Sequence, residues 1–227
     1  MKKYNKIFFT LAMGAALMGG TTSCDDFEEI NISPSVAGEE VVKPYYALNN
    51  SIIGAQQSPH EAERIAVYNW ASAARISGEN STFLSNGRYS DSYNHDYHNG
   101  YISNWIKNAT LAITLADEKA ADLVSEHDIN FNKNVKAFAR IWRVVMISEY
   151  TDNFGPYPIE AFQGSNPAFN SVQEVYYFML DELKAAVADI VLSEEPTADE
   201  AKSDPIFGYN AEKWAKYGNS LRLRLAM

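Results

Sequence analysis

Apolar residues recur at helical spacing along most of the sequence from residue 39 onward, and no strong strand alternation is present. The clearest segment begins with Ser171 and Glu174, which have the S-x-x-E spacing of a helix capping box. Apolar side chains then repeat every three or four residues to about residue 192, as in a helix with one buried face. The sequence therefore predicts a mainly α fold.

Similar reasoning predicts further helices and one irregular insertion. The expected helices are 39–56, 61–75, 101–125, 130–150 and a last one that starts at Asn210. Residues 76–99, rich in Asn, Ser, Gly and Tyr, interrupt this pattern as an irregular loop insertion. The last helix is still running at Met227 without a C-cap, so we expect the fold to be incomplete at the C-terminus.

The N-terminus predicts an exported, lipid-anchored protein. Lysines at 2, 3 and 6 precede an apolar stretch, 7–20, that is shorter than the ~20 residues a membrane-spanning helix needs, so 1–23 reads as a signal peptide. The letters TTSC at 21–24 resemble a bacterial lipobox, in which Cys24 would receive diacylglycerol and become the new N-terminus. The alternative is cleavage nearby that leaves Cys24 as a free thiol.

An acidic segment follows this cysteine. The letters DDFEE at 25–29 resemble the acidic tether that helps direct lipoproteins of the Bacteroidetes group to the cell surface. A solvated linker without a sorting role is the alternative. We therefore expect three parts: a lipoprotein signal peptide at 1–23, a lipidated acidic tether at 24–38 and an α-helical domain at 39–227.

Composition and motifs exclude several classes of function. The net charge of −10 argues against nucleic-acid binding, which needs clustered cations. A single cysteine excludes an intramolecular disulfide and a multi-cysteine metal site. No G-x-S-x-G, H-E-x-x-H or phosphate-binding glycine loop is present, so no catalytic residue and no cofactor are expected. Glycoside hydrolysis by a carboxylate pair stays open, because the separation of the two groups depends on the fold.

The loop insertion holds the candidate ligand-binding residues. Aromatic residues recur every four positions from 89 to 105 and would form a stripe on a helix, on which the C–H faces of a sugar could stack. The candidates are Tyr89, Tyr93 and Tyr97 for stacking, with Asn86, Asn94 and Asn99 for the hydroxyl groups. The alternative, which the residues favour slightly, is that the tyrosines pack against neighbouring helices.

Histidines and turn residues receive structural interpretations. His95 and His98 are spaced as two metal ligands on a helix, with Asp91 as a third, but polar surface residues are the favoured interpretation, so no metal is expected. His60 and His127 have no evident partners in the sequence. After residue 150 a glycine and two prolines must stop the helix, and polar residues 152–153 are expected to bond its freed backbone groups.

Two stretches together resemble the SusD/RagB family. They are EYTDNFGPYP at 149–158, which ends a helix in an aromatic-Gly-x-x-Pro turn before a strand-like segment at 159–161, and YNAEKWAKYGNSLRLRLAM at 209–227. The lipobox, the acidic tether, and Trp105 with Asn108 extend the resemblance over nearly the whole mature chain.

The resemblance implies a lipoprotein of the cell outer membrane that faces the exterior. Such a protein binds a nutrient, a glycan foremost or a peptide, and delivers it to a SusC-like TonB-dependent transporter without catalysis. Its scaffold would be helix pairs of the tetratricopeptide type, although no 34-residue repeat is evident in the sequence. The alternatives are a surface glycoside hydrolase and a structural partner of the transporter that binds no ligand.

Overall fold

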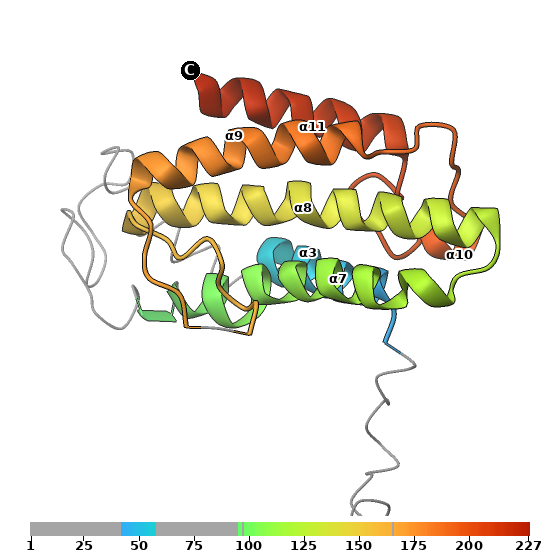
Figure 1. The fold of residues 1–227 in the computed structure, drawn as a ribbon, viewed down its shortest axis with the longest axis horizontal. Coiled ribbons are helices and arrows are strands. Elements are labelled where there is room, and N and C mark those ends of the chain that lie inside the picture. Colours follow the sequence, from blue (N-terminus) through green and yellow to red (C-terminus); the bar gives the residue numbers. More distant parts are fainter. Residues whose placement is uncertain (1–41, 58–94, 97, 165) are drawn as a thin grey trace, which may run out of the picture. The chain divides into compact units, whose positions relative to one another are not determined.

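Helices form the regular secondary structure of the described residues, which are 42–57, 95–96, 98–164 and 166–227 of this computed structural model (Figure 1). Except for Val42, all of them belong to the compact unit Lys43–Met227. The elements are α3 (Pro44–Gln57), η2 (Gly100–Ile106), α7 (Lys107–Lys119), η3 (Ala120–Asp122), α8 (Glu126–Phe154), α9 (Val172–Ala188), α10 (Ala198–Ala201) and α11 (Ala211–Ala226). The prediction of a mainly α fold is confirmed.

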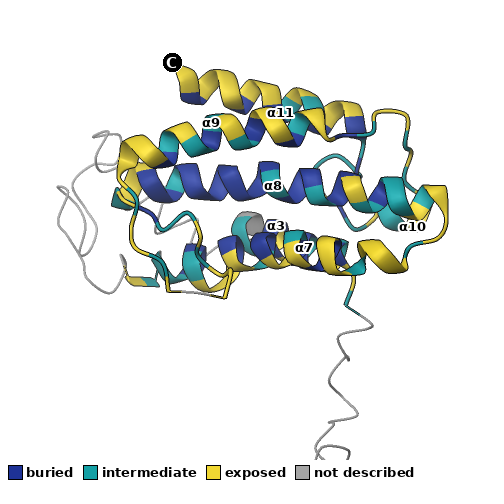
Figure 2. Cartoon of the chain, viewed as in Figure 1, coloured by how far each residue is buried: buried dark blue, intermediate teal, exposed yellow. Residues whose placement is uncertain are grey.

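The long helix α8 forms the centre of this unit. Helices α3 and α7 pack on one side of it and α9 on the other, and α11 packs chiefly on α9 (Figure 1). The chain reverses direction from α7 to α8 and again from α8 to α9, so these helices form antiparallel pairs. Most side chains from Phe131 to Thr151 are buried, and α8 is the most continuously buried helix in Figure 2.

Side chains cap two of the helix starts that the sequence predicts. Ser171 and Glu174 form the expected capping box, and the side chain of Asn210 accepts a hydrogen bond from the amide of Lys213 at 2.9 Å. Helix α3 starts at Pro44 rather than at residue 39, and proline suits a first helical position because it has no amide hydrogen to leave unbonded. The predicted helix 61–75 lies outside the described residues.

The turn after α8 has the expected geometry at its glycine. Gly155 has φ +87° and its amide donates to the carbonyl of Thr151, while the Asn153 side chain donates to the carbonyl of Glu149 at 2.7 Å. The prediction of a strand-like segment at 159–161 is wrong, because these residues form turns. The antiparallel bridge of this region instead joins Tyr157 to Asn170.

The helix predicted at 101–125 is three consecutive elements. It begins as the π-helix η2, continues as α7 and ends in the 3₁₀ turn η3, after which Leu123 is extended. Hydrogen bonds of the π type insert an extra residue into a turn, which hydrophobic periodicity alone does not reveal. The small buried residues of α7 allow this helix to pack closely on α3 and α8.

Several buried polar groups of the interior have hydrogen-bond partners, whereas Oδ1 of Asn49, Nε of Arg143 and Oγ1 of Thr151 have none among the described residues. Ser51 of α3 donates to the carbonyl of Trp105 at 2.7 Å and accepts from the indole of Trp142 at 3.0 Å. Between α8 and α9, Glu182 receives two hydrogen bonds from Arg140 and one from Arg143. Within the residues that the structure describes, no helix has the length and apolar character needed to cross a membrane.

Candidate functional site

Most of the predicted ligand-binding residues lie outside the part of the chain that the structure describes. These are Asn86, Tyr89, Tyr93, Asn94 and Tyr97. Asn99 is described: it lies in a helical turn just before η2, half-buried, with its amide nitrogen 2.9 Å from Nε2 of His95. The structure therefore describes only the point at which the loop insertion joins the helices.

At that point the chain enters the π-helix η2, whose aromatic residues are buried. The hydroxyl of Tyr101 donates to Oε2 of Glu149 at 2.8 Å, and its ring packs edge-to-face on Trp105 and on Tyr150. For Tyr101 and Trp105, the last two members of the predicted stripe, the packing interpretation is therefore correct.

The end of α8 supplies the rest of an aromatic cluster. Tyr150 contacts the rings of Phe154 and Tyr157 at centroid distances of 5.0 and 5.3 Å. The His98 ring lies 5.6 Å from Tyr150 and 5.7 Å from Phe154, so it packs against the end of α8. We call His98, Tyr101, Tyr150, Phe154 and Tyr157 the aromatic end.

Two carboxylates border the aromatic end. Burial raises the pKa of Glu149 above its usual value, and the hydroxyl of Tyr101 and the charge of Arg224 offset this only in part. Asp152, one turn further along α8, accepts a hydrogen bond from the hydroxyl of Tyr176 on α9. Tyr101, Tyr150 and Tyr157 of the aromatic end are buried, so their rings pack the interior at this end of the helices.

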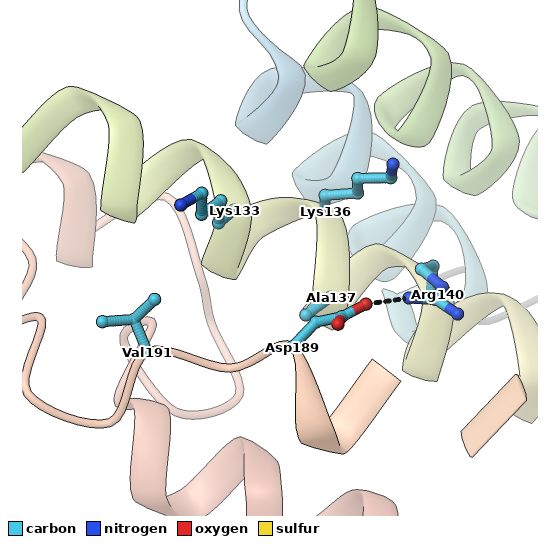
Figure 3. Close-up of a pocket in the computed structure, with 6 residues that line it drawn as sticks. All are labelled: Lys133, Lys136, Ala137, Arg140, Asp189 and Val191. Carbon is cyan, nitrogen blue, oxygen red and sulfur yellow. Dashed lines mark hydrogen bonds and ion pairs between the residues drawn. The ribbon is translucent and has the colours of Figure 1, made fainter. Parts of the chain in front are cut away.

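A hollow of about 380 Å³ lies elsewhere, between α8 and the connection after α9 (Figure 3). Three cations line it, but Arg140 donates to Asp189 at 2.6 Å and to Glu182, and Lys136 pairs with Asp117 at 2.5 Å. Only Lys133 has no ion pair within the described residues. The hollow is therefore close to neutral and carries no strong preference for an anion.

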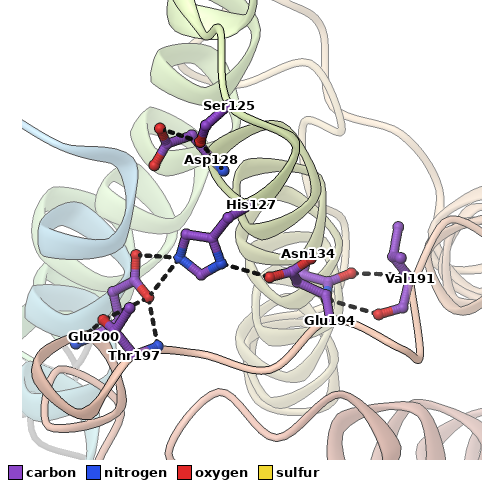
Figure 4. Close-up of polar contacts among 8 residues, drawn as sticks. All are labelled: Ser125, His127, Asp128, Asn134, Val191, Glu194, Thr197 and Glu200. Atoms are coloured by element: carbon purple, nitrogen blue, oxygen red, sulfur yellow. Dashed lines mark hydrogen bonds and ion pairs between the residues drawn. The ribbon is translucent and has the colours of Figure 1, made fainter.

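A polar cluster around His127 is the feature that sequence reasoning missed (Figure 4). The expectation that His127 has no partner is wrong: Nδ1 lies 2.6 Å from Glu194, and Nε2 lies 3.2 Å from Glu200. These partners are 67 and 73 residues away, and no local pattern could have found them. The described residues contain no group of three or more acidic, histidine or cysteine side chains that could hold a metal ion.

The described residues define a scaffold of packed helices, with the aromatic end buried where the loop insertion joins it. A family model for SusD-like proteins, described as "Starch-binding associating with outer membrane", matches residues 39–227. Because this match covers most of the chain, the chain belongs to the SusD-like family. Among curated proteins, no significant match is found.

Solved structures agree with this assignment. A SusD homologue from Parabacteroides distasonis matches at a TM-score of 0.65 and 25% identity, covering 81% of this chain and 35% of its own. A Bacteroidetes AC2a SusD-like protein matches at 0.60 and 25%, covering 82% of this chain and 33% of its own. A chitin-binding protein matches at 0.68 and 20%, covering 82% and 39%; at this identity the likeness shows the fold alone.

These matches confirm a SusD-like fold with antiparallel helix pairs of the tetratricopeptide type. The chain spans only about a third of the length of each of these solved structures. The family is one of nutrient-binding proteins associated with the outer membrane.

Proposed function

We propose that this chain is a lipid-anchored protein of the outer membrane, facing the exterior, that binds a glycan and delivers it to a SusC-like TonB-dependent transporter. A peptide is the alternative ligand. The observation that carries the proposal is the family match over residues 39–227, which names starch binding and the outer membrane. The chain would act by binding, without catalysis.

The proposed organisation assigns one role to each part of the chain. Residues 1–23 direct export, 24–38 form the lipidated acidic tether, and 39–227 form the SusD-like domain. Support comes from the basic and apolar residues before Cys24 and from the four carboxylates at 25–29. Attachment through Cys24 would be stable because more than one acyl chain enters the membrane, whereas a single chain binds only marginally.

The anchor is tested by replacing Cys24 in the producing bacterium. With Cys24→Ser, we expect the protein to leave the outer-membrane fraction, whereas the wild-type chain stays there and its cysteine carries diacylglycerol in a mass spectrum. A matched control is Ser23→Ala, which keeps a small residue before the cysteine and should leave attachment unchanged. An unmodified Cys24 in the wild-type chain would contradict the anchor.

The proposed ligand site is the loop insertion where it meets the aromatic end. Tyr89, Tyr93 and Tyr97 would stack on sugar faces, and Asn86, Asn94 and Asn99 would bond hydroxyl groups. The described residues support this placement, because Asn99 leads directly into η2 and the aromatic end. A loop beside a rigid helical scaffold is a common position for binding residues.

Alanine substitutions at Tyr93 and Tyr97 test this site. If both rings stack on ligand, we expect the double variant to weaken affinity at least tenfold, since one aromatic contact contributes roughly 1 kcal/mol or more. The matched control is Tyr177→Ala on α9, which also removes an exposed tyrosine but far along the sequence from the insertion. Unchanged affinity in the double variant would remove these residues from the site.

One observation keeps a glycoside hydrolase as the second candidate. Burial raises the pKa of Glu149, and a carboxyl group with a raised pKa is what a general acid needs. Against this, the hydrogen-bond partner of Glu149 is the hydroxyl of a wholly buried residue, Tyr101. After incubation with malto- and chito-oligosaccharides, we expect to recover the oligosaccharides at their full length. Shorter products that form with the wild-type chain but not with the Glu149→Gln variant would favour a glycoside hydrolase.

A further inference from the structure

His127 joins three separate elements at the start of α8 (Figure 4). It lies in the first turn of that helix, with Nδ1 2.6 Å from Oε1 of Glu194 in the connection after α9. Its other nitrogen, Nε2, lies 3.2 and 3.3 Å from the two carboxylate oxygens of Glu200 in α10. The ring therefore lies between two acidic side chains from two different segments.

Whether the ring can bond both carboxylates depends on how many protons it carries. A neutral imidazole carries one N–H, so it can donate to one carboxylate but must present a lone pair to the other. An imidazolium carries two N–H groups and can donate to both. With both carboxylates ionised, only the protonated ring can keep both contacts, and it does so through two charge-assisted hydrogen bonds.

The cluster is partly shielded from solvent. The side chains of Glu194 and Glu200 are 13% and 16% exposed and that of His127 is 35% exposed. The His127 ring also stacks on Phe131, with an angle of 9° between the ring planes. Screening by water is thus reduced at the carboxylates, and the ring has a fixed orientation between them.

The other charged groups around the ring do not reverse this preference. Burial and the positive end of α8 both disfavour the imidazolium, but two carboxylates at hydrogen-bond distance outweigh them, so the pKa of His127 lies above its usual value. On α8 itself, Glu126 and Asp128 add negative charge near the helix start. From α3, Tyr45 packs on Phe131 but stays neutral, because burial raises its pKa.

Neighbouring contacts between α8 and the same connection do not depend on pH in this way. Asn134, two turns along α8, donates to the carbonyl of Val191 at 3.0 Å and accepts from its amide at 2.7 Å. Arg140 donates to Asp189 further along at 2.6 Å, a contact in which His127 takes no part. Residues 189–191 are therefore held to α8 whether or not His127 is protonated.

We propose that His127, Glu194 and Glu200 form a pH-sensitive clasp that holds α10 and residues 194–200 against the start of α8. The clasp is closed while the ring carries two protons. When the ring loses one proton, at most one of the two carboxylates keeps its hydrogen bond, and α10 loosens while residues 189–191 stay attached. The clasp lies outside the proposed ligand site and does not depend on the proposed function.

The sign of the effect follows from the raised pKa. The stabilisation is fully present below the pKa of an unfolded histidine, about 6.5, and is lost as the pH rises through the higher pKa of the folded chain. Acid therefore closes the clasp and alkali opens it.

Nuclear magnetic resonance of the full chain tests the protonation directly. Titration of the histidine ring protons, with His127 assigned by its absence in His127→Gln, should give a pKa above 6.5 for His127. Glu194→Gln should lower that pKa, whereas Glu195→Gln, the neighbouring exposed glutamate, should not. A pKa at or below 6.5 in the wild-type chain would overturn the proposal.

Hydrogen exchange of backbone amides tests the release. After correction for the intrinsic pH dependence, exchange in α10 should increase about tenfold when the pH rises through the His127 pKa, as loss of one charge-assisted bond implies. The Val191 amide, bonded to Asn134, is the internal control and should not change. Equal pH responses at α10 and Val191, or the same α10 response in His127→Gln, would refute the clasp.

Discussion

Gly218 of α11 lies so close to Val187 of α9 that a Cβ atom added to the glycine would be 2.6 Å from Cγ2 of Val187. The same atom would lie 3.0 Å from Cδ1 of Ile141 on α8. The last helix can approach the other two only because residue 218 has no side chain. This contact fixes how α11 docks on the central helices.

Gly218→Ala should therefore destabilise the protein, although alanine favours a helix by about 1 kcal/mol over glycine. Overpacking of a filled interface costs typically 1–3 kcal/mol, so we expect the free energy of unfolding to fall by about 1 kcal/mol or more. Urea unfolding followed by circular dichroism measures this. Asn219→Ala, at an exposed neighbouring position, is the control, and a Gly218→Ala protein as stable as that control would contradict the packing.

The carboxylate of Glu182 should be essential to the contact between α8 and α9. Replacement by glutamine would leave Arg143, which is buried, without its carboxylate partner, and removing one member of a buried ion pair costs about 3 kcal/mol. Asp181→Asn, the exposed neighbour on α9, should change stability by less than about 0.5 kcal/mol. Similar stabilities for the two variants would show that the ion pairs contribute little.

The Glu182 contribution should also depend on pH. Burial alone would raise the pKa of Glu182, but the hydrogen bond from Arg140 and the positive charges of Arg140 and Arg143 lower it by a larger amount. The pKa of Glu182 therefore lies below its usual value of 4.5. The stabilisation is then present above pH 4.5 and is lost as the pH falls through the folded pKa. The difference in unfolding free energy between wild type and Glu182→Gln should shrink below that pH; a constant difference would contradict the ion pairs.

Asp204 organises the approach to α11. Its carboxylate accepts hydrogen bonds from the indole of Trp214 at 2.7 Å and from the amides of Tyr209 and Ile206 at 2.8 and 2.9 Å. Asp204→Ala would leave buried donors without partners and should lower the free energy of unfolding by about 3 kcal/mol. Asp199→Ala removes an exposed ion pair instead and should cost less than about 1 kcal/mol.

Near-ultraviolet circular dichroism provides a second measurement for Asp204→Ala. The tryptophan signal should weaken in this variant because the Trp214 indole, which stacks on Phe138, loses its fixed partner. An unaltered spectrum together with unaltered stability would show that Asp204 does not organise this region.

Glu149 should have the opposite dependence on pH from Glu182. Because burial raises its pKa above 4.5, ionisation of Glu149 costs stability as the pH rises from there through the folded pKa. Glu149→Gln should therefore lose less stability than wild type over that range, while the exposed Glu160→Gln should behave as wild type. A variant that loses more stability than wild type on raising the pH would contradict the burial of this carboxylate.

Features encoded within a few residues were predictable from the sequence. The capping box of Ser171 and Glu174, the cap at Asn210 and the positive φ of Gly155 each depend on neighbours at most four positions away. The prediction of a strand-like segment at 159–161 was wrong. The backbone pairing in this region joins Tyr157 to Asn170, and local composition does not show which residues pair.

Features built from distant residues were not predictable. The cap of α8 by Ser125 is local. The partners of His127, two residues further along, come instead from a connection and a short helix that only the folded chain brings together. The burial of Tyr101 and its bond to Glu149 likewise depend on the packing of η2 on α8. For the loop insertion, the tyrosine and asparagine assignments stay predictions.

The most direct measurement is a calorimetric titration of the full chain with oligosaccharides and peptides, followed by analysis of the recovered ligand. We predict saturable binding of at least one glycan and its recovery without cleavage. Absence of binding to every ligand while the chain still associates with its transporter, or recovery of cleaved glycan, would contradict the proposed role in nutrient binding.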